Sequence, residues 1–121
     1  KVLVQLGADV HAESNCGRTA LHVAAYWGHT ETVKALVELG ADVRAQNIHG
    51  CTALHDAAHC GHIETVNAMG QLGADVRAQE NGGWTALHVA ALNGHTETVK
   101  ALVELEARRP SEPPAGADVD A

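Results

Sequence analysis

The stretch GRTALHVAA (residues 17–25) decides the fold, because it occurs three times in the chain. It returns as GCTALHDAA at residues 50–58 and as GWTALHVAA at residues 83–91, with a period of 33 residues. Self-similarity at a fixed period of about 20–50 residues is the sequence signature of stacked repeat arrays. The sequence therefore predicts a repeat protein in which each unit needs its neighbours to bury its apolar faces.

Each unit contains signals for two short helices. Thr19 is a good N-cap for a first helix, which Gly28 ends after about two turns. A second helix is expected from Thr30, with apolar residues at i, i+3 and i+4 spacing, and it ends at Gly40. Residues 42–50 have no helical period and lead to the next unit as a turn or hairpin.

These motifs resemble the ankyrin repeat, which has a 33-residue period and a TPLHxA signature. The matching segments are TALHVA at residues 19–24, TALHDA at 52–57 and TALHVA at 85–90. Alanine replaces the signature proline in all three, which removes a rigid first helical position at small cost. The resemblance implies an all-α, ankyrin-type helical solenoid with a helix-turn-helix and a hairpin or turn in each repeat.

The repeats set the expected domain boundaries, and the chain is interpreted as a piece of a longer protein. The predicted parts are the C-terminal half of a preceding repeat (1–16), two ankyrin-like repeats (17–49 and 50–82), a truncated third (83–106), and a Pro-containing tail ending in GADVDA (107–121). The tail is either a flexible insertion or an altered splice of the array.

The second repeat contains one departure from the apolar pattern. Gly70 stands where the other repeats have Val37 and Val103. Glycine lowers helix propensity by about 1 kcal/mol and removes a packing side chain. The sequence therefore predicts that the second repeat is the softest.

Composition excludes several classes of function. The net charge is −7 and the longest basic run is the pair Arg108 and Arg109, so direct binding to nucleic acid is not expected. No apolar run is long enough to cross a bilayer. Three cysteines without a CxxC pair fit neither a disulfide framework nor a zinc ribbon and favour a reducing, intracellular and cytoplasmic location.

Three positions vary between two otherwise identical units. Residues 17–39 and 83–105 share 20 of 23 residues. They differ as Arg18 against Trp84, Tyr26 against Leu92, and Trp27 against Asn93. A site that accepts such different shapes is not a packed core position, so the three aromatic residues are predicted to be exposed. They are interpreted as a selected contact surface; the alternative is drift of exposed positions after duplication.

By the ankyrin resemblance, these positions match a concave face that binds partner proteins. The implied partner-binding residues are Arg18, Tyr26, Trp27, Ile48, His49, Cys51, His59, Cys60, Asn81, Trp84, Leu92 and Asn93. The predicted function is a protein-protein interaction module. The alternative is a substrate-recruiting arm of a larger enzyme, a kinase or a ubiquitin ligase, whose catalytic part lies elsewhere. Uncapped repeats at the ends also allow self-association.

Histidine and cysteine content does not indicate an enzyme or a cofactor. Six of the nine histidines recur with the period and are expected to be part of the scaffold, the resemblance implying that the signature histidine bonds to the neighbouring threonine. His49, Cys51, His59 and Cys60 form the one group considered for zinc, but their spacing is too long for a closed site, so no metal is predicted. Asp56, where the other repeats have valine, is either a polar contact in the groove or a tolerated half-exposed substitution.

Overall fold

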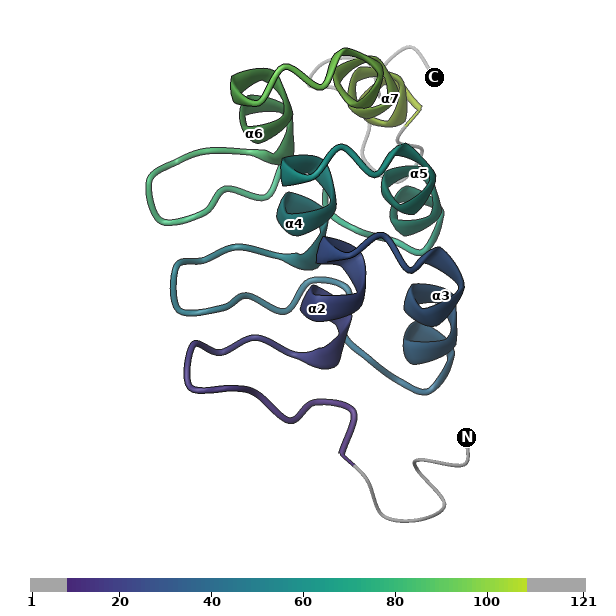
Figure 1. Ribbon diagram of the computed structural model, residues 1–121, viewed down its shortest axis with the longest axis vertical. Coiled ribbons are helices and arrows are strands. Elements are labelled where there is room, and N and C mark those ends of the chain that lie inside the picture. The colour runs from purple at the N-terminus through teal and green to yellow at the C-terminus, as the bar shows by residue number, and fades with distance from the viewer. Residues whose placement is uncertain (1–8, 109–121) are drawn as a thin grey trace, which may run out of the picture.

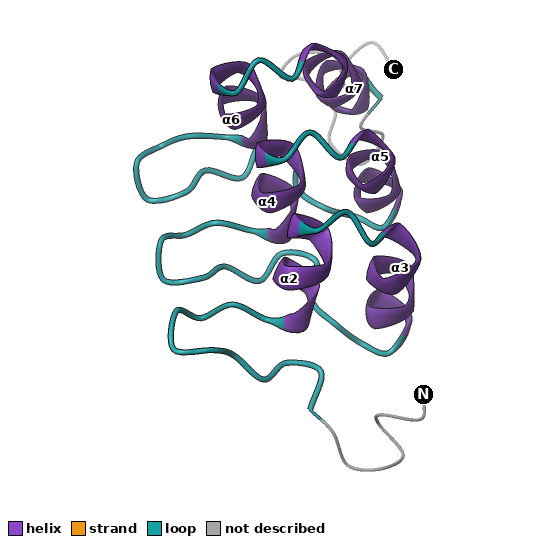
Figure 2. Cartoon of the chain, in the orientation of Figure 1, coloured by secondary structure: helices purple, strands orange, loops and turns teal. Residues whose placement is uncertain are grey.

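The computed structural model describes residues 9–108, which form three pairs of helices stacked in two columns (Figure 1). The pairs are α2 (Ala20–Tyr26) with α3 (Thr30–Glu38), α4 (Ala53–His59) with α5 (Ile63–Gln71), and α6 (Ala86–Leu92) with α7 (Thr96–Ala107). We call these pairs, with their loops, the first, second and third repeats. Within the described residues every segment between helices is loop or turn, and the long loops project on the side of α2, α4 and α6 (Figure 2). The predicted all-α solenoid is confirmed.

A capping box starts the first helix of each repeat. The Thr19 hydroxyl accepts a hydrogen bond from the backbone N–H of His22, while the His22 Nδ1 accepts one from the backbone N–H of Thr19 at 3.1 Å. These contacts satisfy helix N–H groups that have no partner within the helix. Thr52 with His55, and Thr85 with His88, repeat the arrangement. The predicted Thr caps and the scaffold role of the signature histidines are confirmed.

The same histidines tie one repeat to the next. Because Nδ1 of His22 accepts a hydrogen bond, its proton lies on Nε2, which donates to the Cys51 carbonyl at 2.9 Å. The His55 Nε2 donates in the same way to the Trp84 carbonyl at 2.9 Å. Both histidine side chains are buried, so each provides a buried hydrogen-bond donor for a backbone carbonyl of the next repeat.

The turn between the two helices of a repeat depends on glycine for two reasons. Gly28 has a positive φ of 74°, which side chains with a Cβ adopt at a cost. A Cβ on Gly28 would also lie 2.7 Å from the ring of His62, which donates a hydrogen bond to the Tyr26 carbonyl. The glycine therefore allows the histidine of the next repeat to approach the backbone.

The last helix is longer than its equivalents. Helices α3 and α5 each have 9 residues, whereas α7 has 12. Gly40 and Gly73, with φ of 107° and 100°, follow the shorter helices, and Glu106 takes their place in α7. Without a residue that readily adopts positive φ, the helix continues to Ala107.

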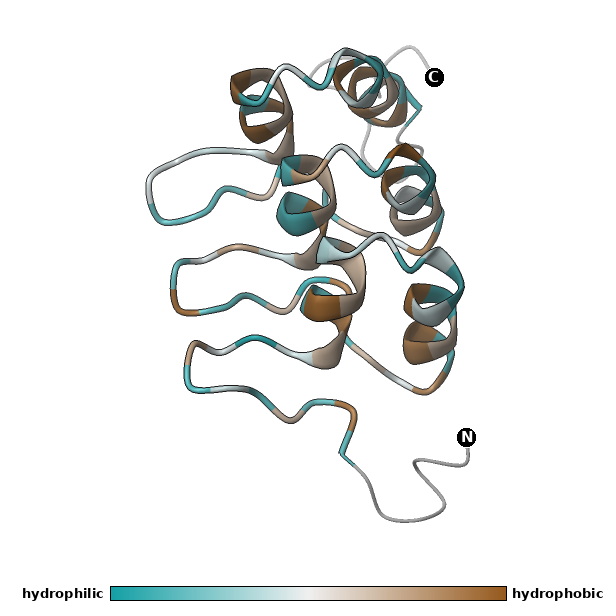
Figure 3. Ribbon diagram, in the orientation of Figure 1, coloured by the Kyte–Doolittle hydropathy of each residue, from teal (hydrophilic) through white to brown (hydrophobic). Residues whose placement is uncertain are grey.

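The core lies between the two columns of helices and runs continuously through the repeats. Leu21 and Leu54 from the first column pack with Val33, Val66 and Met69 from the second. Helix α4 is more hydrophilic than α2 and α6 (Figure 3), because its sequence is ALHDAAH where theirs are ALHVAAY and ALHVAAL. Each repeat thus shares its core with its neighbour, as expected of a solenoid.

A residue of the next repeat occupies the space beside Gly70, which the sequence did not predict. A Cβ at this position would lie only 2.6 Å from Cδ2 of Leu105, so the side chain of Leu105 already fills the space. Of the equivalent residues, Val37 packs against the core in the first repeat and Val103 is exposed in the third. The glycine is therefore matched to a leucine of the next repeat.

Some sequence predictions concern residues outside the described range. The first eight residues of the predicted leading half repeat, and the tail from residue 109 with its GADVDA motif, are not described by the structure. Among the helices that it does describe, none is both long and apolar enough to span a membrane.

Candidate functional site

The candidate contact residues lie on the side of the array formed by the long loops and by α2, α4 and α6. We call this side the inner face. Trp27 is 63% exposed and Leu92 is 70% exposed at the C-terminal ends of α2 and α6, and Ile48 is 59% exposed in a loop. Trp84, just before α6, is 40% exposed. The predicted exposure of the two tryptophans is confirmed.

Tyr26 is not exposed as predicted, because it is half-buried against the next repeat. Its ring stacks on that of His59 at a centroid distance of 6.2 Å and meets the edge of Trp27 at 5.3 Å. The Arg18 guanidinium lies 5.5 Å from the centre of the Tyr26 ring, within the range of a cation–π contact. The third repeat has Leu92 at the position of Tyr26 and Trp84 at that of Arg18.

Asp56 joins this cluster and was missing from the predicted contact residues. Its carboxylate lies 3.5 Å from the Arg18 guanidinium, and its side chain is 17% exposed. Burial raises the pKa of Asp56, whereas the nearby Arg18 guanidinium lowers it. Asp56 therefore makes a polar contact with the preceding repeat. The sequence contained one signal for this ion pair. The first repeat has Arg18 where the third has Trp84, and the second repeat has Asp56 where the third has Val89.

Two of the candidate residues support the scaffold as well as the surface. The Asn93 side-chain amide donates to the His59 carbonyl at 3.1 Å, and that of Asn81 donates to the Ile48 carbonyl at 3.1 Å. The backbone N–H of Asn81 also donates to the His49 carbonyl at 2.9 Å. These bonds hold successive loops and helix ends in register, so the inner face is a fixed surface rather than a set of free side chains.

Comparison with known families identifies the array. A family model described as ankyrin repeats (3 copies) matches residues 1–80, and one described as ankyrin repeats (many copies) matches residues 61–103. This chain belongs to the ankyrin repeat family. A search of curated proteins finds no match. Ankyrin repeats generally act as protein-protein interaction modules and are typically non-catalytic.

Two of the three cysteines of the ankyrin array are partly buried. Burial raises the pKa of the Cys51 and Cys60 thiols, which disfavours the nucleophilic thiolate. Cys16 is exposed, and all three are free. Within residues 9–108, no three or more His, Cys, Asp or Glu side chains come together in a way that could hold a metal ion. The four residues considered for zinc are therefore not brought into one site.

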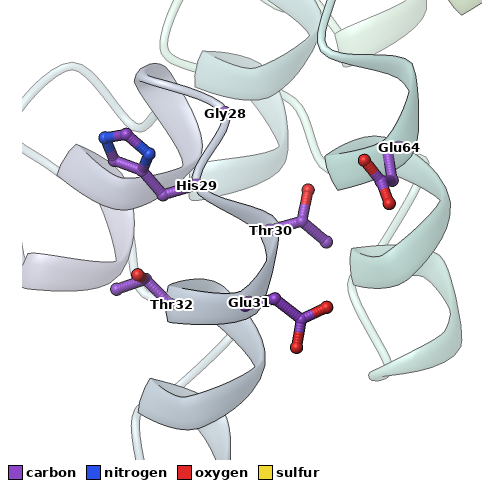
Figure 4. A pocket seen from close by; sticks show the side chains of 6 residues that line it. All are labelled: Gly28, His29, Thr30, Glu31, Thr32 and Glu64. Carbon is purple, nitrogen blue, oxygen red and sulfur yellow. The ribbon is translucent and has the colours of Figure 1, made fainter.

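The surface depressions of the ankyrin array are products of stacking. One of about 310 Å³ is lined by Gly28, His29, Thr30, Glu31, Thr32 and Glu64 (Figure 4). In Figure 4, Thr30 and Glu64 approach it from neighbouring helices, and the His29 ring points to the opposite side. A second depression of about 310 Å³ involves Gly61, Gly94 and residues 95–98, one repeat further on. Because the depression recurs with the repeat, we assign it to the scaffold.

Proposed function

We propose that this ankyrin array binds a partner protein through the inner face. The observation that carries the proposal is the contrast between scaffold and surface in the first and third repeats. Over residues 17–39 and 83–105, their caps, core residues and the glycines between the two helices, Gly28 and Gly94, are identical, and the three positions that differ all lie on the inner face. The same scaffold thus presents different side chains to a partner in the first and third repeats.

Trp27 is the strongest anchor on this face. Tryptophan is enriched among interface hot spots because it buries a large area with few rotatable bonds. The Trp27 ring is exposed at 63%, yet it rests on the edge of Tyr26, which is itself held by His59 and Arg18. A side chain ordered in advance loses less conformational entropy when it binds.

The chemistry of the face favours a partner with apolar side chains. Trp27, Ile48 and Leu92 supply exposed apolar surface. The charges of Arg18 and Asp56 are already paired with each other. A partner therefore gains most from burying apolar groups, and the loop amides and histidines supply hydrogen bonds around them.

The proposal is tested with substitutions that use the chain's own residues. Trp27→Asn and Ile48→Asn introduce the residues found at the equivalent positions Asn93 and Asn81, so the scaffold should tolerate both. The wild-type chain is used to capture partners, and each purified partner is titrated by calorimetry. We expect each substitution to weaken binding by at least about tenfold, as for an interface hot spot.

Lys34→Ala, on the exposed side of α3, is the matched control and should leave the affinity unchanged. A partner that binds both inner-face variants as tightly as the wild type, but loses affinity with Lys34→Ala, would contradict the proposal.

A further inference from the structure

The chain contains two Asn-Gly pairs, which the structure holds in different ways. Asn81 and Gly82 lie in the loop before α6, and Asn93 and Gly94 lie in the turn between α6 and α7. In such a pair the backbone nitrogen of the glycine can attack the side-chain amide carbon of the asparagine, because glycine has no Cβ to obstruct the approach. All four residues are exposed, so water reaches both pairs.

The attacking nitrogen is engaged at one pair and free at the other. Gly94 donates its backbone N–H to the Ala91 carbonyl at 3.1 Å. The backbone N–H of Gly82 makes no hydrogen bond to another residue of the described range. Because an amide must lose its proton before its nitrogen can attack, the N–H that is already bonded to a carbonyl is the less reactive of the two.

The two asparagine side chains are also held to different degrees. The Asn93 side-chain nitrogen donates to the His59 carbonyl and to Nδ1 of the His59 ring, each at 3.1 Å. The Asn81 side-chain nitrogen donates once, to the Ile48 carbonyl at 3.1 Å. Fewer hydrogen bonds must therefore break before Asn81 can react.

We propose that Asn81 is a site at which the folded chain modifies itself in water, whereas Asn93 is protected. The Gly82 nitrogen loses its proton to solvent and bonds to Cγ of Asn81; the bond from Cγ to Nδ2 breaks, and Nδ2 leaves as ammonia. Water then opens the resulting five-membered succinimide ring at either carbonyl carbon. Opening at Cγ gives aspartate, and opening at the main-chain carbon gives isoaspartate, in which the backbone continues through the former side chain.

Neither product can keep the contact between the loops of neighbouring repeats. Asn81 bonds to two successive carbonyls, Ile48 through its side chain and His49 through its backbone N–H at 2.9 Å. A carboxylate is an acceptor only, so it cannot donate to the Ile48 carbonyl and it repels the carbonyl oxygen. Isoaspartate also adds a methylene to the backbone, inside the turn that the Gly83 N–H closes on the Glu80 carbonyl at 2.8 Å.

The modified position lies on the inner face, beside the exposed side chain of Ile48. Conversion adds a negative charge there and removes a bond that holds the Ile48 loop. A partner that buries apolar groups on this face would therefore bind the modified chain less tightly. This last consequence rests on the proposed function, whereas the conversion and its effect on stability do not.

The two pairs can be compared within one chain. The wild type is incubated at mildly alkaline pH and cut with chymotrypsin, which separates the two sites after Trp84, and each peptide is measured by mass spectrometry. We expect Asn81 to convert at least about fivefold faster than Asn93, the factor for one net hydrogen bond of about 1 kcal/mol. In guanidinium chloride, where the chain is unfolded, the two rates should approach each other.

Gly82→Ala tests the route of the reaction. The new Cβ hinders the attacking nitrogen, so Asn81 should convert more slowly while Asn93 is unaffected. This Cβ would lie 2.9 Å from Oε1 of Glu80, the end of a flexible side chain that can move, so folding should be retained and is checked by circular dichroism. A native chain in which Asn93 converts as fast as Asn81, or in which Asn81 converts only after unfolding, would overturn the proposal.

Asn81→Asp supplies one of the two products directly. We expect its unfolding midpoint in guanidinium chloride to lie below that of the wild type, because the bond to the Ile48 carbonyl is lost. An unchanged midpoint would overturn the inferred loss of the loop contact. No partner enters these measurements, so a failure of the proposed function would leave their outcome unchanged.

Discussion

The junction between the first and second repeats differs from that between the second and third, although the backbone contacts are the same. In both, a signature histidine donates to a carbonyl of the next repeat at 2.9 Å. At the first junction Thr30 and Thr65 share a hydrogen bond of 2.7 Å. At the second, Ile63 replaces the threonine and the Thr98 hydroxyl is buried with no partner among the described residues.

The inner-face contacts of the two junctions differ as well. The first has the Arg18–Asp56 ion pair and the stack of Tyr26 on His59. The second has an amide contact from Asn93 to His59 instead. The bonds to backbone carbonyls are thus the same at both junctions, whereas the side chains that meet across them differ.

The largest expected effect comes from Gly70→Val, which gives the second repeat the residue that the other repeats have. Sequence comparison predicts stabilisation, because valine is the better helix former. The structure predicts the opposite, because a Cβ at residue 70 would lie 2.6 Å from Cδ2 of Leu105, so the leucine side chain would have to move from its present place. We expect a loss of about 1–3 kcal/mol in the free energy of unfolding, measured by urea denaturation.

A double-mutant cycle with Leu105→Ala tests that cause. Leu105→Ala should cost less in the Gly70→Val chain than in the wild type, because it relieves the collision. Equal costs in both backgrounds would show that the two side chains do not compete for space.

A smaller effect, of opposite sign, is expected from Ile63→Thr, which makes the second junction resemble the first. The new hydroxyl can pair with the Thr98 hydroxyl, so we expect a gain of about 1 kcal/mol in the free energy of unfolding. Ile63→Val has the same branching without the hydroxyl and is the matched control. A gain in both variants would rule out the hydrogen bond as its source.

The smallest effect concerns the charge at the first junction. Burial raises the pKa of Asp56, so above about pH 4, where an unfolded aspartate loses its proton, the native chain holds more protons than the unfolded chain. The protonated Asp56 thus stabilises the native chain at low pH, and this stabilisation is lost as the pH rises through the native pKa of Asp56. Arg18 limits the loss, because its guanidinium lowers the pKa.

The free energy of unfolding of Asp56→Asn, relative to the wild type, should therefore increase as the pH is raised from about 4 toward neutral. Arg18→Ala should strengthen this trend when it is present in both chains. A constant difference across the pH series would mean that Asp56 titrates alike in the folded and unfolded states.

The sequence by itself determined the helix pairs, their caps and their stacking. Thr19 and His22 meet within one turn of helix, and Gly28 adopts its backbone conformation locally, so these features depend on residues close in the chain. Their recurrence every 33 residues then predicted a solenoid. The exposure of Trp27 and Trp84 followed from the same comparison of repeats.

Only the tertiary structure decided which side chains meet across the junctions. Tyr26 is half-buried because His59 and Arg18 flank it, Asp56 is paired because Arg18 stands one repeat earlier, and Gly70 is packed because Leu105 covers it. Each outcome depends on a contact with a residue of the neighbouring repeat and on the offset between stacked helices. The sequence pattern of a single repeat does not contain this information, because these contacts form between two neighbouring repeats.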